Sequence, residues 1–168
     1  KAIAREDSCY LVEGYTDVMA LHQAGIEHVV SSSGTALTVN QIKLIRRYTK
    51  NITVLFDGDA AGIRASLRGV DLLLAEGLNV NVVLFPDGDD PDSYSKKVPA
   101  DVLRRHIDEE AKDFVAFKLE LLARESADDP VKRTEMIHSI LGSIAVIPDA
   151  IQQGVYLKLA SEELALSE

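Results

Sequence analysis

The first 95 residues alternate between short apolar runs and amphipathic stretches. The apolar runs are rich in β-branched residues, are bounded by turn residues, and predict four strands, at "CYLV", "HVVSS", "ITVLF" and "VNVVLF". Between them apolar residues recur at helical spacing, which predicts helices over about residues 16–23, 38–48 and 60–75. Strands that alternate with helices predict an α/β fold, with a mostly parallel sheet and helices on both faces.

Capping signals support the limits of these helices. Thr38 is followed three residues later by Gln41, which is the spacing of a capping box and marks the start of a helix. Gly25 and Gly77 stand just after two of the periodic stretches. A glycine commonly ends a helix at such a position, because it tolerates a left-handed backbone.

After "PDGDDPDSY" the strand pattern stops and helical spacing takes over. Three apolar faces follow: Ala111, Phe114, Phe117 and Leu121; Ile137, Ile140, Leu141 and Ile144; and Ile151, Val155 and Leu159. Asp129-Pro130 and Pro148-Asp149 separate these faces. We therefore expect an α/β domain over residues 1–97 and a small helical subdomain, of about three helices, over residues 98–168.

Composition narrows the class of protein. The chain has 168 residues, 46% of them hydrophobic, which suits one domain or a domain with an appendage. Cys9 is the single cysteine, which excludes an internal disulfide framework and a cysteine zinc cluster, and its place in "CYLVEG" indicates a buried thiol. No stretch has the length of a membrane span and no secretory signal opens the sequence, so we expect a cytoplasmic protein without membrane contact.

Carboxylates follow three of the predicted strands. Glu13 ends the first strand, with Asp17 one turn into the next helix, and Asp57 and Asp59 flank a glycine after the third. The fourth strand leads into "PDGDDPD", which contains Asp87 and Asp89. The carboxyl ends of parallel strands meet at one edge of a sheet, where ligands of open α/β folds bind.

Crowded carboxylates repel one another unless a cation neutralises them. Mg²⁺ and Mn²⁺ prefer oxygen ligands, and the alternation in "DGD" puts both aspartates on one side of an extended chain. The pattern therefore predicts a divalent-metal site. The alternative is structural, because Asp-Gly is also a common turn signal and isolated D-x-D matches are mostly solvated loops.

Basic residues are scarce, and the net charge of −9 disfavours a general nucleic-acid binder. Four of them nevertheless lie on one face of the second predicted helix: Lys43, Arg46, Arg47 and Lys50. This face could follow a nucleic-acid backbone, or it could simply be solvated. Gly34 and Thr35, just before that helix, could hold a phosphate on backbone N–H groups, or form an ordinary turn.

Four stretches together resemble the Toprim domain of primases, topoisomerases and some nucleases, and most closely that of the DnaG-type bacterial DNA primases. They are "LVEGYTDVMALHQAGI", "SSSGTALTVNQIKLI", "VLFDGDAAGIRAS" and "LFPDGDDPDSY". The tail "VIPDAIQQGVYLKLASEEL" is similar to the helices that close the primase catalytic core. The resemblance covers nearly the whole chain, with one departure at Ser33, where an apolar residue is expected before Gly-Thr.

The resemblance implies a Toprim metal-binding catalytic domain at residues 1–97 and the helical subdomain of the polymerase core after it. It implies synthesis of short RNA primers on single-stranded DNA from nucleoside triphosphates, with two ions of Mg²⁺ or Mn²⁺. Carried over by position, Glu13, Asp57 and Asp59 are the catalytic and metal-binding residues, and Asp17, Asp87 and Asp89 form a secondary acidic cluster. Whether Glu13 is a metal ligand or a general base stays open.

Three parts of the family have no counterpart in this sequence. They are an N-terminal zinc-binding domain, the basic half of the polymerase core, and a C-terminal region that binds the replicative helicase. We therefore expect a catalytic-core portion that makes no primer alone. A Toprim nuclease or topoisomerase, or a non-catalytic metal-binding module, are the alternatives, and "FDGDAAG" with "LFPDGDDPD" argues against cleavage.

Overall fold

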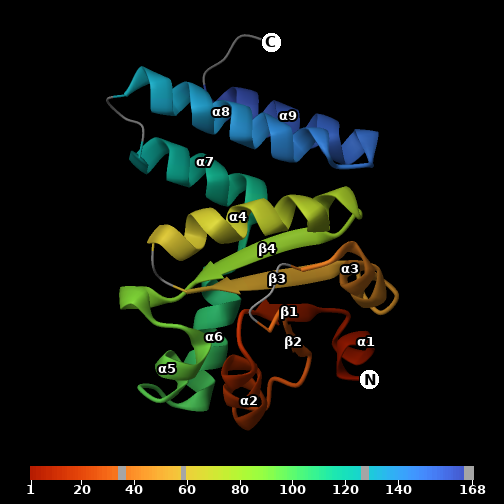
Figure 1. The fold of residues 1–168 in the computed structure, drawn as a ribbon, viewed down its shortest axis with the longest axis vertical. Helices are drawn as coiled ribbons and strands as arrows, with labels where there is room; N and C mark the ends of the chain where they lie inside the picture. Colours follow the sequence, from red (N-terminus) through yellow and green to blue (C-terminus); the bar gives the residue numbers. More distant parts are fainter. Residues whose placement is uncertain (34–36, 58–59, 126–128, 165–168) are drawn as a thin grey trace.

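A computed structural model describes residues 1–33, 37–57, 60–125 and 129–164 (Figure 1). The sheet has the strand order β2-β1-β3-β4-β5. Its strands are β1 (Cys9–Val12), β2 (Val29–Ser31), β3 (Asn51–Phe56), β4 (Asn79–Leu84) and β5 (Lys112–Asp113). The first four are parallel and β5 is antiparallel to β4, so the prediction of a mostly parallel sheet is confirmed.

The predicted helices are also present. They are α2 (Tyr15–Gln23), α3 (Val39–Arg46) and α4 (Ala60–Ala75). The Thr38 capping box is formed, because Thr38 Oγ1 accepts from Gln41 N at 3.3 Å and Gln41 Oε1 accepts from Thr38 N at 2.9 Å. Gly25 and Gly77 have φ of 78° and 74°, as their positions after helices require.

The pattern did not predict three further helices and one 3₁₀ turn. They are α1 (Ala2–Glu6), η1 (Pro86–Gly88), α5 (Pro91–Ser95) and α6 (Ala100–Glu110). The tail is formed by α7 (Phe114–Glu125), α8 (Pro130–Ala145) and α9 (Ala150–Leu164). No helix in the described part of the chain is long and apolar enough to cross a bilayer.

Helices cover both faces of the sheet, as Figure 1 shows, and the two faces have separate cores. The side chains of β3 alternate between them: Val54 and Phe56 lie in the core under α3, α4 and the start of α7, and Leu55 lies in the core over α2 and α6. Cys9 is fully buried in the first of these cores, as predicted for a structural thiol, and burial raises the pKa of its thiol to about 12.

A third core joins α7 to α8 and α9, which lie beyond α4 in Figure 1. Helix α7 takes part in two cores: Phe114 and Phe117 pack toward the sheet, while Val115 and Leu122 pack toward α8 and α9. The domain boundary expected between residues 97 and 98 stays a prediction. Helix α6, beyond that point, covers one face of the sheet, and β5 extends the sheet by one strand.

One predicted apolar face is wrong. Ile151 and Val155 are 81% and 64% exposed, and α9 buries Ala160 and Leu164 instead. Leu159, the third residue of the predicted face, is partly buried against the third core beside Ala160 and Leu164, so the buried face of α9 is shifted from the predicted one. Ala111, expected on the face of Phe114, is exposed and lies before the first turn of α7.

Candidate functional site

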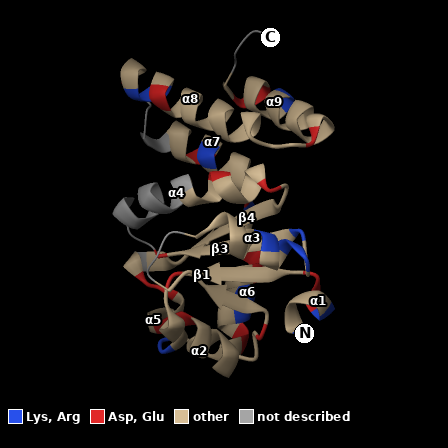
Figure 2. Cartoon of the chain, turned by 45° about the vertical axis from the view of Figure 1, so that its right-hand side comes forward, with Lys and Arg blue, Asp and Glu red and all other residues tan. Residues whose placement is uncertain are grey.

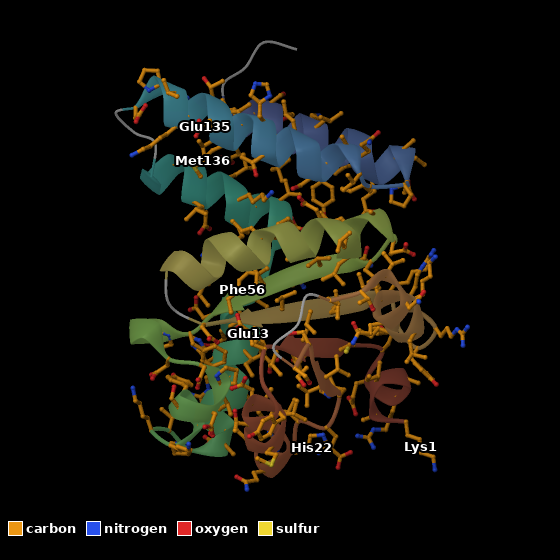
Figure 3. All side chains as sticks on the ribbon, in the orientation of Figure 1. Lys1, Glu13, His22, Phe56, Glu135 and Met136 are labelled. Atoms are coloured by element: carbon orange, nitrogen blue, oxygen red, sulfur yellow. The ribbon has the colours of Figure 1, made fainter. Side chains whose placement is uncertain are left out.

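Glu13 and Asp57 lie at the same edge of the sheet. Each is the first residue after its strand, β1 for Glu13 and β3 for Asp57. The two strands are neighbours and parallel, with Leu11 opposite Val54. The register puts Glu13 level with Phe56 and Asp57 one residue further along, so both carboxylates lie just beyond the ends of neighbouring strands, which are about 4.8 Å apart. Figure 3 shows Glu13 beside Phe56, the last residue of β3.

The two carboxylates differ in exposure: Glu13 is exposed and Asp57 is half-buried. Glu13 is followed by Gly14, the N-cap of α2, so the chain turns from strand to helix directly after the carboxylate. The positive end of the α2 dipole therefore faces the edge where both carboxylates lie, which favours negative charge there.

Asp17 occupies a different environment, because it is buried and only 4% exposed. One carboxylate oxygen accepts from Gly14 N at 2.9 Å, which closes the capping box of α2, and the other accepts from Asp92 N at 3.2 Å. Burial raises the pKa of the Asp17 carboxyl above its ordinary value, while the two backbone donors act in the opposite direction. Asp17 thus ties the end of β1 to the segment that follows β4.

Asp89 is likewise engaged by protein donors. Lys97 Nζ donates to both of its oxygens, at 2.7 and 2.8 Å, and Ser93 Oγ donates to it at 2.9 Å. The hydrogen bonds from Lys97 hold the pKa of the Asp89 carboxyl below its usual value. Asp90 caps α5 by accepting from Ser93 N at 2.6 Å, so the acidic segment after β4 is held in one conformation by its own side chains.

Several predicted site residues lie outside the described residues: Gly34, Thr35 and Asp59, as well as the side chain of Asp87. Among the side chains that the structure describes, no three His, Cys, Asp or Glu residues are grouped as a metal site. The metal-binding roles of the six acidic residues stay predictions. The structure places Glu13 and Asp57 just beyond the ends of two adjacent strands, and it uses Asp17 and Asp89 as hydrogen-bond acceptors for the protein itself.

Sequence reasoning did not find Ser93 and Lys97, which hold Asp89, or the backbone N–H of Asp92, which holds Asp17. A signal for one of them was present, because Asp90-Pro91 followed by Ser93 has the spacing of a helix N-terminus. The four basic residues predicted as a nucleic-acid contact are all exposed, three on or at the end of α3 and Lys50 just before β3.

Comparison with known proteins agrees with this geometry. A family model described as Toprim-like matches residues 10–95. The DNA primase of Halalkalibacterium halodurans is 36% identical over 167 residues, which is 99% of this chain and 28% of the relative. That of Clostridium acetobutylicum is 33% identical over 166 residues, 96% of this chain and 27% of the relative. The chain thus spans about a quarter of the length of these relatives.

Solved structures give the same result. A DNA primase domain from Pseudomonas aeruginosa superposes with a TM-score of 0.83 at 28% identity, covering 99% of this chain and 54% of that one. The zinc-binding and RNA polymerase domains of Aquifex aeolicus primase give 0.81 at 31% identity, covering 98% of this chain and 39% of that one. The chain therefore belongs to the Toprim-like family, and over nearly its whole length it is related to the catalytic core of DnaG-type bacterial DNA primases.

Proposed function

We propose that this chain supplies the metal-binding part of a primase catalytic core, which joins nucleoside triphosphates into short RNA primers on single-stranded DNA. The observation that carries the proposal is the placement of Glu13 and Asp57 at the ends of two adjacent parallel strands. The relatives described above are DNA primases, which favours primer synthesis over the nuclease and topoisomerase alternatives.

The residues at this edge suit a hard divalent cation. Mg²⁺ is usually held by one or two carboxylates together with water and substrate phosphate oxygens. Glu13 and Asp57 supply such a pair, and the exposure of Glu13 leaves room for a phosphate to complete the shell. Asp59 is the third ligand that the sequence offers, and Asp87 is the candidate on the fourth strand. Mn²⁺ has the same ligand preference.

The reaction proposed is nucleotidyl transfer. A 3′-hydroxyl attacks the α-phosphate of the incoming nucleotide, a new phosphodiester bond forms, and pyrophosphate leaves. Bound divalent ions, two in this proposal, supply charge neutralisation of the phosphates and lower the pKa of the attacking hydroxyl. Glu13 serves either as a ligand or as the acceptor of the hydroxyl proton. Asp17 and Asp89 act as positioning residues, because they hold the strand ends and α5 together around the carboxylates.

Solved relatives suggest the partners. One is a DnaG primase catalytic domain bound to single-stranded DNA, and another is the RNA polymerase domain of Mycobacterium tuberculosis primase with a double-stranded DNA that has an overhang. We extend DNA template binding to this chain on that basis. Zinc would belong to a separate domain, as the Aquifex aeolicus structure indicates, and the replicative helicase would be a partner of the whole primase, in the cytoplasm.

Titration of the 168-residue chain with Mn²⁺ tests the metal site. The electron paramagnetic resonance signal of free Mn²⁺ measures how much of the ion is bound. We expect weak binding by the parent, because no substrate phosphate completes the shell, and still weaker binding by Glu13→Gln and Asp57→Asn. Glu110→Gln is the matched control. Glu110 is an exposed acid at the end of α6, and its substitution removes the same charge as the two site substitutions do. Affinity equal in all four proteins would refute the proposed site.

A further inference from the structure

A long stretch of this acidic chain contains no acidic residue at all. From His28 to Phe56 there is no Asp or Glu, and the only charged side chains are Lys43, Arg46, Arg47 and Lys50. All 27 acidic residues and the other 14 of the 18 basic residues lie elsewhere in the chain. The charge is therefore segregated, and its positive part is concentrated on α3 and the turn that follows it, as Figure 2 shows.

The fold turns this stretch into a solvent-facing basic surface. Ile42 and Ile45 are 0% and 7% exposed and anchor α3 to the sheet. Lys43 and Arg46 lie on the remaining face of α3, Arg47 and Lys50 follow it, and all four are exposed. We call this surface, made of Lys43, Arg46, Arg47 and Lys50, the α3 basic face.

The α3 basic face also lacks internal neutralisation. Among the described residues, none of its four side chains makes an ion pair or a side-chain hydrogen bond. Most other described cations do have an acidic partner: Arg5, Lys96, Lys97, Arg105, Lys112, Lys118, Lys132 and Lys158. Asp7, which contacts the turn after α3, accepts hydrogen bonds from Thr49 and Asn51.

We propose that the α3 basic face binds the phosphate backbone of a nucleic-acid strand. Lys43 and Arg46 lie on α3, Arg47 is its C-cap, and Lys50 follows in the turn before β3, so four cations stand within eight residues of chain. A nucleic-acid strand carries one negative charge per nucleotide, so closely spaced exposed cations suit its phosphate backbone. Tyr48, 53% exposed, follows Arg47 directly and offers an aromatic ring for a base to stack on.

The topology gives this surface a direction. Helix α3 follows β2, whose carboxyl end lies at the edge that carries Glu13 and Asp57, and it leads into β3, whose start lies at the opposite edge. A strand held along α3 therefore runs away from the candidate metal centre. This inference rests on the template binding of the proposed function and names the surface for it, but binding here requires neither a metal ion nor catalysis. The two can fail separately, in different variants and different assays.

The proposal is tested by titrating a labelled oligo-dT strand with the 168-residue chain. Fluorescence anisotropy gives the affinity at each of a series of salt concentrations. Four phosphate contacts predict a slope of about −2.8 for log affinity against log salt, at about 0.7 per contact. In the double variant Arg46→Gln/Arg47→Gln the slope should fall in magnitude by about 1.4. The affinity at low salt should fall roughly tenfold or more.

Lys132→Gln/Arg133→Gln is the matched control. Both residues are exposed on α8, far from α3 in the sequence, and the change alters the net charge by the same amount. A role of the α3 cations in helix stability alone would change the melting temperature, measured by circular dichroism, and leave the slope unchanged. An α3 variant with the slope and affinity of the control overturns the proposal.

Further arms identify the partner. Oligo-dT, a mixed-sequence single strand, RNA and duplex DNA should all lose affinity by a similar factor in the α3 variant, because a backbone contact does not read bases. The strand bound most tightly by the parent identifies which nucleic acid it is. Poly-L-glutamate that binds as tightly as the oligonucleotide per unit charge, and loses as much in the variant, would assign the face to an acidic protein and overturn the proposal.

Discussion

Asp17 joins two segments that are 75 residues apart in the sequence. Its replacement by alanine leaves the N–H groups of Gly14 and Asp92 without their acceptors. An unsatisfied buried donor costs about 1–3 kcal/mol, so we expect Asp17→Ala to lower the free energy of unfolding by about that amount, measured by urea denaturation with a metal chelator present.

Glu13→Ala provides the comparison for this prediction. Glu13 is exposed and sits one residue beyond β1, so its removal in chelator should change the free energy of unfolding by less than about 0.5 kcal/mol. With Mn²⁺, Asp17→Ala should gain more stability than Glu13→Ala, because it keeps Glu13, Asp57 and Asp59 while Glu13→Ala loses one of these predicted ligands. Equal stability losses for the two variants in chelator would show that Asp17 does not position the site.

At this residue scale the sequence predicted where carboxylates meet but not what each one does. Glu13 and Asp57 were placed at one edge because the ends of parallel strands converge whatever the details of packing. Asp17 and Asp89 were assigned to a secondary acidic cluster by the resemblance to the primase family. Their partners, the N–H of Asp92 and the ammonium group of Lys97, come from α5 and the residues after it, and the position of α5 depends on tertiary packing against α2.

At the scale of helices, Lys118 links three elements. Its ammonium group on α7 donates to Ser143 Oγ at 2.5 Å and to Ser139 Oγ at 3.1 Å on α8, and lies 3.8 Å from Asp71 on α4. Removing only the acid leaves a buried charge, whereas an apolar side chain of similar length does not. We expect Asp71→Ala to destabilise by about 3 kcal/mol and Lys118→Met by less than about 1 kcal/mol, in thermal or urea unfolding.

The pH dependence of unfolding tests the same contact. Burial lowers the pKa of Lys118 below its ordinary value, and Asp71 offsets this only in part. A lysine whose pKa is lower in the folded state loses its proton at a lower pH in that state than in the unfolded one. The free-energy cost of burying its charge therefore disappears as pH rises from the folded pKa toward the unfolded pKa. As pH rises toward the ordinary lysine pKa of about 10.4, the parent should therefore gain stability relative to Lys118→Met. A constant difference would contradict this.

The helices and strands that the sequence predicted have strong local signals. β-Branched runs gave β1 to β4, and a capping box gave the start of α3. Among the missed elements, α5 has a capping signal at Asp90, whereas β5 has only two residues, which are too few for a strand pattern. For α9 the apolar spacing indicated the face of Ile151 and Val155, and packing against α7 and α8 buries Ala160 and Leu164 instead.

At the scale of the whole molecule, α7 joins the helical tail to the sheet, because it contributes to two cores. We expect Leu122→Ala, in the third core, to unfold the sheet more readily as well. Cys9 is a natural probe, since it is fully buried in the sheet and its thiol pKa is raised to about 12, so it reacts only after opening. A loss of about 3 kcal/mol should speed its labelling about a hundredfold.

Ile151→Ala is the control, because Ile151 is 81% exposed and its removal should leave the labelling rate of Cys9 unchanged. If Leu122→Ala lowered the thermal stability of the tail without changing Cys9 labelling, the sheet and tail would be independent units. In that case the division expected at residues 97 and 98 would describe two separately unfolding parts.

The sheet is long in the middle and short at both sides. Among the strands that the structure describes, β3 and β4 have six residues each, while the outermost strands β2 and β5 have three and two. An outermost strand presents unpaired N–H and C=O groups that another chain can use as a template for aggregation. Because β2 and β5 are so short, they offer a neighbouring copy of the chain almost no backbone to pair with. They also flank the longer apolar strands and so shield those from intermolecular association.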